Sequence, residues 1–199
     1  MRRAQSNAGE FNAGAELPYQ LRLGDFRLAL QDIYDLLYDI NTALLARNLP
    51  RLEEIVRPAV FSGILSDALT AALATHSRAL RENRFHNGHP DLVPAGMYPY
   101  DSIQSGEEGV EIKATRGRGA VDMHGARPSW ICVFRYEVDS TTEPARDRAP
   151  TRIVEVLLAK LTVDDFRRNA RGEFGTTTAS PNRNGLQKLR ENRIYREPT

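Results

Sequence analysis

Two segments of almost unbroken apolar residues, 130–134 and 154–158, constrain the fold of this 199-residue chain most strongly. Both are short, and the loop between them contains Pro144 and Pro150, so the pattern predicts two strands. A strand that is apolar on both faces must be covered on both faces. Because helical patterns occur elsewhere in the chain, the sequence predicts an α/β protein in which central strands lie between helices.

The first part of the chain is expected to be helical. Between Asp25 and Pro50, apolar residues recur at alternating intervals of three and four, which predicts a helix with an apolar seam. This seam packs either within its own subunit or against a second copy of the chain. A short helix over 52–57 and a long amphipathic helix over 60–82 are expected to follow. The seam positions are Leu23, Phe26, Leu30, Ile33, Leu37, Ile40 and Leu44.

Polar and apolar residues alternate in the segment 110–115, which reads Val-Glu-Ile-Lys-Ala-Thr. Period-2 alternation predicts a strand with Glu111 and Lys113 on the same face. Asp91 precedes a short apolar run that ends at Pro94, which predicts a second strand able to pair beside the first. In that case the two carboxylates can share a divalent cation such as Mg²⁺, which prefers oxygen ligands. Lys113 would then face a phosphate group bound to the cation.

Pro90-Asp91 followed by Glu111-Ile112-Lys113 resembles the active-site signature of the PD-(D/E)xK nucleases, which include most type II restriction endonucleases. The resemblance implies Asp91, Glu111 and Lys113 as catalytic residues, and Asp91, Glu111 and Ile112 as ligands of Mg²⁺. It also implies a restriction-endonuclease-like core over 85–199, with a central mixed sheet flanked by helices. A helical region over 17–84 precedes this core, and residues 1–16, small and polar, are expected to be disordered. A type II enzyme of this size would act as a homodimer on double-stranded DNA.

Composition bears on the choice of residues in this motif. Only three of the 27 basic residues are lysines, so a chain that otherwise uses arginine has a compact, titratable ammonium group at position 113.

Asp101 is the alternative to Asp91, because it stands ten residues before Glu111 and follows Tyr98-Pro99-Tyr100. Asp91 is favoured because it directly follows a proline and leads into apolar strand residues.

The C-terminal end is the positive end of the chain. Residues 166–199 contain eight basic and three acidic residues, whereas the net charge of the whole chain is +1. A helix is expected to begin at the capping-box-like residues 162–165, and the loop over 172–185 supplies neutral hydrogen-bonding side chains suited to phosphate and base-edge contacts. A basic glycine-containing loop also follows Thr115. The DNA contacts expected are Arg116, Arg118, Arg127, Arg167, Arg168, Arg171, Thr178, Asn182 and Arg183.

Other features exclude some functions and leave alternatives. The single cysteine, Cys132, lies in an apolar segment and is expected to be buried rather than nucleophilic. No secretory signal and no run of about 18 apolar residues is present, so the protein is expected to be cytoplasmic. A P-loop pattern is also absent, which argues against an ATP-driven motor. The alternatives to a restriction enzyme are a repair or recombination nuclease and a non-catalytic DNA-binding or interaction protein.

Overall fold

The computed structural model describes residues 2–116, 123, 125–168 and 178–198. Their main feature is a six-stranded sheet with the strand order β1-β2-β3-β4-β5-β8. The β3–β4 pair is parallel and the other neighbouring pairs are antiparallel, so the sheet is mixed. The strands are β1 (Leu80–Glu82), β2 (Leu92–Pro94), β3 (Val110–Thr115), β4 (Ser129–Glu137), β5 (Arg152–Leu161) and β8 (Arg193–Arg196).

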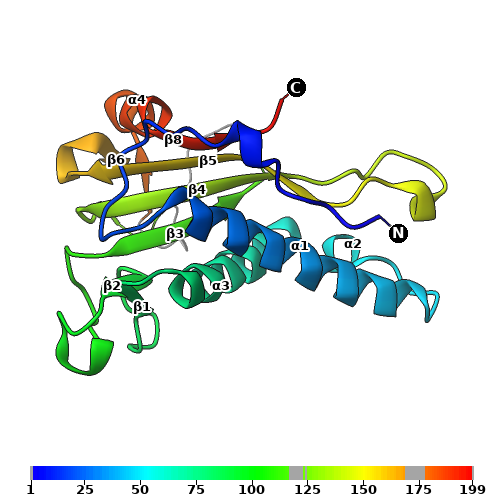
Figure 1. Cartoon of the computed structure of the whole chain (residues 1–199), viewed down its shortest axis with the longest axis horizontal. Coiled ribbons are helices and arrows are strands. Elements are labelled where there is room, and N and C mark those ends of the chain that lie inside the picture. The colour runs from blue at the N-terminus through cyan, green and yellow to red at the C-terminus, as the bar shows by residue number, and fades with distance from the viewer. Residues whose placement is uncertain (1, 117–122, 124, 169–177, 199) are drawn as a thin grey trace.

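Helices cover both faces of this sheet (Figure 1). One face packs against α1 and α3, and the other carries α4 and a separate two-stranded sheet, β6–β7. The remaining elements are α1 (Leu23–Leu45), α2 (Leu52–Ile55), α3 (Pro58–His76), α4 (Arg183–Glu191), β6 (Phe166–Arg168), β7 (Ala179–Pro181) and the short 3-10 turns η1 (Ala8–Glu10), η2 (Pro99–Asp101), η3 (Ala145–Asp147) and η4 (Val163–Asp165).

Side-chain alternation along β4 builds two hydrophobic cores. Cys132 and Phe134 belong to the core under α1 and α3, whereas Ile131 and Val133 belong to the core under α4. All four side chains are buried, with at most 3% of their surface exposed. The prediction of an α/β protein with a central sheet between helices is therefore confirmed, as are the mixed sheet and the helical N-terminal region.

The apolar seam of α1 is used within the subunit. Phe26, Leu30, Ile33 and Leu37 are at most 4% exposed and belong to the same core as α3 and the sheet. Of the two alternatives that the seam allowed, packing within the subunit is the one observed. The seam therefore gives no support to a dimer contact.

The helix expected over 60–82 ends earlier than its apolar pattern indicates. In the structure α3 stops at His76, and the Ser77 hydroxyl accepts a hydrogen bond from the Leu80 N–H at 2.9 Å. Residues 80–82 then pair with β2. Pairing with a distant strand therefore decides the conformation of residues 80–82. The apolar spacing did not predict this, because a local pattern does not specify a distant partner.

Residues 2–16, which composition predicts to be disordered, contact other elements of the protein: Arg3 pairs with Asp35 of α1, and residues 11 and 12 lie beside the C-terminal strand. The Phe11 and Tyr195 rings are 4.8 Å apart between centroids, and the Asn12 N–H donates to the Ile194 carbonyl at 2.9 Å. The partners of residues 11 and 12 are about 180 residues away in the sequence, so local composition carries no sign of them.

Among the described residues, α3 is the one helix whose length and composition are sufficient to cross a membrane. Its Phe61, Leu65, Leu69 and Leu73 are buried against the sheet and α1. An apolar core helix meets the same criteria, and the structure is consistent with a soluble protein.

The capping-box pattern at 162–165 produces a single turn of helix, not the short helix that was predicted. Asp165 accepts hydrogen bonds from the Thr162 N–H and hydroxyl at 2.8 and 3.0 Å. After this turn the chain becomes extended, and Arg167 and Arg168 lie on β6, paired with β7. Arg171 lies outside the described residues.

Arg51 joins the helical region to the loop between β4 and β5. Its side chain is 2% exposed, and its guanidinium donates to the carbonyls of Asp139 and Ala149, each at 2.9 Å. The Arg51 Nε atom also lies 3.4 Å from a carboxylate oxygen of Glu53, whose side chain is fully buried. A buried charge network therefore holds the β4–β5 loop against α2.

Candidate active site

The candidate site lies where β2 and β3 separate. Among the described residues, the two strands pair only at Leu92 and Val110, and beyond this point the edge of β3 that faces away from β4 has no strand partner. Side chains accept hydrogen bonds from the N–H groups of that edge instead. Asp91 Oδ2 accepts from the Ile112 N–H at 2.7 Å, and Ser66 Oγ of α3 accepts from the Ala114 N–H at 2.9 Å. Buried main-chain donors need such partners, so the strand edge itself positions Asp91.

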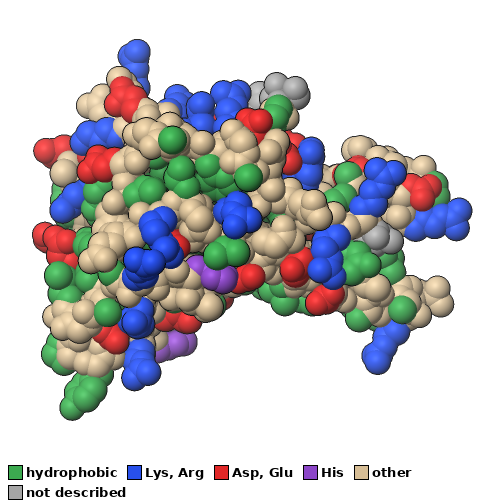
Figure 2. Space-filling model, in the orientation of Figure 1, with side chains coloured by type: hydrophobic (Ala, Val, Ile, Leu, Met, Phe, Trp, Pro, Cys, Tyr) green, Lys and Arg blue, Asp and Glu red, His purple; other side chains and the backbone are tan. Residues whose placement is uncertain are grey.

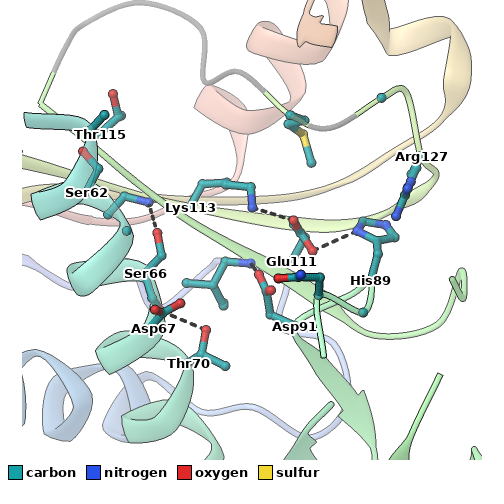
Figure 3. A pocket seen from close by; sticks show the side chains of 18 residues that line it. Ser62, Ser66, Asp67, Thr70, His89, Asp91, Glu111, Lys113, Thr115 and Arg127 are labelled. Carbon is teal, nitrogen blue, oxygen red and sulfur yellow. Dashed lines mark hydrogen bonds and ion pairs between the residues drawn. The ribbon is translucent and has the colours of Figure 1, made fainter. Parts of the chain in front are cut away.

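Glu111 is the centre of a cluster of charged side chains (Figure 3). Its Oε1 lies 2.6 Å from Lys113 Nζ, and its Oε2 lies 2.8 Å from His89 Nδ1. Glu111 is 7% exposed and His89 is 4% exposed. The alternation of β3 places Glu111 and Lys113 on the same face, as predicted, and His89 reaches Glu111 from the loop before β2.

These side chains line a cavity of about 950 Å³. The floor is formed by β3 and Asp91, and one wall is formed by α3, which presents Ser62, Ser66, Asp67 and Thr70 (Figure 3). Arg127 belongs to another part of the lining. The cavity therefore combines three carboxylates, those of Asp67, Asp91 and Glu111, with an ammonium group and several hydroxyls, which is a polar site rather than an apolar ligand pocket.

The carboxylates of Asp91 and Glu111 differ in their affinity for protons. Burial and the nearby charge of Glu111 raise the pKa of Asp91 to about 7, although Lys113 and the Ile112 N–H act in the opposite direction. Burial also tends to raise the pKa of Glu111, but the His89 hydrogen bond and the Lys113 charge outweigh it and lower this pKa to about 2. Burial tends to lower the pKa of Lys113, but the charges of Glu111 and Asp91 outweigh it and raise this pKa above its usual value. Without a cation, the site therefore favours a charged Glu111, a charged Lys113 and a partly protonated Asp91.

The donor set fits a hard divalent cation. Asp91 and Glu111 offer carboxylate oxygens. Burial and the Glu111 charge raise the pKa of Asp91, and a cation bound beside it would favour its charged form. The N–H and C=O of one strand residue point to the same side, so the Ile112 carbonyl faces the same edge of β3 as the N–H that donates to Asp91. In the described part of the chain, no three His, Cys, Asp or Glu side chains form a metal-binding cluster. Mg²⁺ suits such a site because it keeps several waters and needs only one or two carboxylates with a substrate phosphate.

Asp101, the alternative to Asp91, lies elsewhere. It is part of η2, and its Oδ1 accepts a hydrogen bond from the Gly96 N–H at 2.8 Å. Asp101 does not line the cavity with Glu111 and Lys113. Of the two aspartates considered from the sequence, the structure places only Asp91 beside these two residues.

The residues expected to contact DNA are spread over two regions. Arg127 lines the cavity, whereas Arg116 is exposed beside it and donates to the Val138 carbonyl at 3.2 Å. Arg167 and Arg168 are exposed on β6, and Arg183 is exposed at the start of α4. Arg116 and Arg127 therefore form the first region, and the second region is Arg167, Arg168, Thr178, Asn182 and Arg183. Arg118 and Arg171 lie outside the described residues.

A main-chain bridge connects the second region to the cavity. Met123, which lines the cavity, exchanges two hydrogen bonds with Ala179 of β7, at 2.8 and 2.9 Å. The Asn182 side chain is engaged within the protein, where it caps α4 by accepting from the Asn184 and Gly185 N–H groups. Figure 2 shows Lys and Arg side chains, interspersed with acidic ones, on the edge of the molecule that carries α4 and β8.

Three residues of the site lie outside the motif that the sequence contains. His89 contacts Glu111, Ser66 accepts from β3, and Asp67 lines the cavity near Lys113. The position of His89, two residues before Asp91, was the available signal. Nothing local indicates that the Ser66 and Asp67 side of α3 covers β3, because that contact joins segments more than 40 residues apart.

The raised pKa of Asp91 predicts how stability depends on pH when metal is absent. The folded state binds the Asp91 proton more tightly than the unfolded state, whose pKa is near 3.8. The stability contributed by this group is therefore complete below about pH 3.8 and is lost as pH rises toward 7. The lowered pKa of Glu111 has the opposite effect on stability, but this contribution changes only below about pH 4.5. We expect urea unfolding in EDTA to show lower stability at pH 8 than at pH 5.

Other groups also titrate between pH 5 and pH 8, so the informative quantity is the difference between variants. Asp91→Asn should remove part of this pH dependence, and Asp101→Asn should leave it as in the parent protein. A parental profile in Asp91→Asn would show that Asp91 is an ordinary acidic side chain.

Comparison with known proteins adds no assignment to this geometry. No protein-family model, curated protein or solved structure matches the chain.

Proposed function

We propose that this protein is a Mg²⁺-dependent type II restriction endonuclease that hydrolyses phosphodiester bonds of double-stranded DNA at a specific site. The proposal includes a restriction-endonuclease-like core built on β2 and β3. The observation that carries it is the convergence of Asp91, Glu111 and Lys113 in one cavity, with a short bond between Glu111 and Lys113. In an ordinary solvated pair on a strand, the carboxylate would not be expected to be only 7% exposed at the floor of a cavity, as Glu111 is.

Each side chain has a distinct role in this proposal. Asp91, Glu111 and the Ile112 carbonyl would hold Mg²⁺, which would polarise the scissile phosphate and promote loss of a proton from the attacking water. Lys113, held by Glu111, would orient that water and neutralise charge that develops on the phosphoryl oxygens. The water oxygen would form a new bond to phosphorus as the bond to the leaving oxygen of the sugar breaks. The proton lost by the water would pass to solvent in the cavity, and the leaving oxygen would take up a proton from solvent.

The cavity also suits a nucleic-acid backbone on its α3 side. Ser62, Ser66 and Thr70 are short hydroxyl side chains that follow one face of α3. Ser62 hydrogen-bonds to the Tyr136 hydroxyl and Thr70 donates to the Ser66 carbonyl. The Ser66 hydroxyl accepts from an N–H of β3 and keeps its own hydrogen to donate. Neutral hydroxyls of this kind are common partners of phosphate oxygens. Arg127, from another part of the lining, would add positive charge to the path of the DNA.

One experiment tests the function directly. Purified protein is incubated with plasmid and phage DNA of mixed sequence, with Mg²⁺ and with EDTA. Discrete fragments that require Mg²⁺ support a restriction enzyme, whereas a smear indicates a nuclease without a specific site, such as a repair or recombination enzyme. DNA that stays intact under all conditions but is bound by the protein favours a non-catalytic DNA-binding protein.

The proposal includes a homodimer in the cytoplasm. One catalytic motif per chain cuts one strand, and a two-fold symmetric protein matches a two-fold symmetric DNA site. The buried seam of α1 does not supply the dimer contact, so a dimer is expected from the reaction and from the symmetry of its DNA site.

The exposed arginines of β6 give a prediction on DNA affinity. In Arg167→Ala/Arg168→Ala we expect weaker DNA binding and a slope of log K against log salt that is smaller by about two units, because each phosphate contact contributes about one unit. Fluorescence anisotropy with a duplex at several salt concentrations measures both. The matched control is Arg27→Ala/Arg47→Ala, which removes the same charge from exposed positions on and just after α1, on the opposite face of the sheet. An equal change in both double variants would indicate a general effect of charge.

A further inference from the structure

Glu111 is held from both sides, and only one of its two contacts belongs to the catalytic set. Lys113 contacts Oε1 at 2.6 Å, and His89 Nδ1 contacts Oε2 at 2.8 Å. Each carboxylate oxygen has more than one lone pair, so both oxygens can still accept from a further partner. With donors at both oxygens, the carboxylate cannot rotate about its last side-chain bond without breaking a contact.

His89 itself is held firmly by the main chain. Its N–H donates to the Gln104 carbonyl at 3.2 Å, and its carbonyl accepts from the Gly106 N–H at 2.7 Å. The side chain is 4% exposed and lines the cavity. The loop over 104–106 therefore determines where the imidazole ring lies, and the ring in turn determines where Oε2 of Glu111 lies.

The two ring nitrogens have different surroundings. Nδ1 faces a carboxylate oxygen and therefore carries the hydrogen. Nε2 is enclosed and has no hydrogen-bond partner among the described residues. Two roles are thus conceivable for the ring, one acting through Nδ1 on Glu111 and one acting through Nε2 on a bound molecule.

We infer that His89 is a positioning residue, which acts through Nδ1 to hold the Glu111 carboxylate in the orientation that binds the divalent cation. The 2.8 Å contact with Glu111 supports the role through Nδ1, and Nε2 is enclosed by the protein. Hydrogen-bond partners of metal-binding carboxylates orient the ligand, and their loss typically lowers metal affinity or activity by about 10–100-fold. This inference rests on the proposed function, because it takes Glu111 to be a metal ligand.

Three substitutions separate the two ring nitrogens. In His89→Asn, the amide nitrogen is the same number of bonds from Cβ as Nδ1, so the contact to Glu111 can be kept. In His89→Gln, the amide nitrogen corresponds instead to Nε2. His89→Ala removes both nitrogens, and His86→Ala is the matched control because His86 is exposed in the preceding loop.

The readout is Ca²⁺ binding to the full chain without DNA, measured by calorimetry, with Mg²⁺ dependence of DNA cleavage as a second measurement. We expect His89→Ala and His89→Gln to bind Ca²⁺ about 10–100-fold more weakly, with His89→Asn and His86→Ala near the parental value. The Mg²⁺ concentration needed for half-maximal cleavage should rise in the same order. Melting curves in EDTA identify any variant that has lost its fold. Such a variant is left out, and the conservative variant His89→Asn is then compared with the parent protein.

Two results would overturn the inference. Parental Ca²⁺ affinity in all the variants would show that Glu111 needs no support from His89. Full affinity in His89→Gln together with weak binding in His89→Asn would assign the role to Nε2. If the parent protein cuts DNA and its variants give either result, the inference alone is refuted. If the parent protein neither binds Ca²⁺ nor cuts DNA, the proposed function is refuted as well.

Discussion

Lys113→Ala is expected to reduce Mg²⁺-dependent DNA cleavage by at least about 10²–10³-fold, the usual effect of removing one group that stabilises charge in a transition state. The variant keeps Asp91 and Glu111, so most of the affinity for a divalent cation should remain. DNA binding in Ca²⁺, a larger cation that can occupy such a site without supporting cleavage, should also survive. Single-turnover cleavage and DNA binding in Ca²⁺ measure the two properties separately.

Other substitutions make this result specific. Lys160→Ala is the matched control, because Lys160 is on β5 with about half of its side chain exposed and lies outside the cavity. Glu111→Ala should lose both metal binding and cleavage. Asp91→Ala should also abolish cleavage, whereas Asp101→Ala should only impair it. If Lys113→Ala cuts DNA at the parental rate, Glu111 and Lys113 are a structural ion pair and the nuclease proposal fails.

Arg51→Ala is expected to lower the free energy of unfolding by about 3–5 kcal/mol, the usual cost of removing one partner from a buried charge pair. The substitution leaves Glu53 buried beside the space of the lost guanidinium and leaves the carbonyls of Asp139 and Ala149 without this donor. The stability of a whole domain is about 5–15 kcal/mol, so the loss should be evident in urea unfolding at neutral pH.

The control for this prediction is Arg47→Ala, at an exposed position just after α1. Exposed substitutions usually change stability by no more than about 0.5 kcal/mol. Arg51→Lys should recover only part of the stability, because an ammonium group cannot reproduce the planar fork that donates to two carbonyls. A parental unfolding curve for Arg51→Ala would mean that the β4–β5 loop is held by other contacts.

The sequence by itself determined the elements whose pattern is local. The apolar segments of β4 and β5 predicted strands covered on both faces, and the alternation in β3 placed Glu111 and Lys113 on one face. The short apolar run after Asp91 predicted the pairing of β2 with β3, and the apolar spacing of α1 predicted its helix. Each of these follows from the period of a strand or a helix, which a short window of sequence contains.

Only the tertiary structure decided which distant groups meet. It turned the end of the predicted long helix into β1, it assigned the α1 seam to the interior of the subunit, and it brought residues 11 and 12 onto β8. It also separated Asp91 from Asp101, although both stand at spacings that the motif allows. His89 and Ser66 joined the site, and Arg51 became buried, through contacts that no local period encodes. A partner 20 to 180 residues away is chosen by the packing of the whole chain, because burial and hydrogen-bond satisfaction are properties of the assembled layers and not of any one segment.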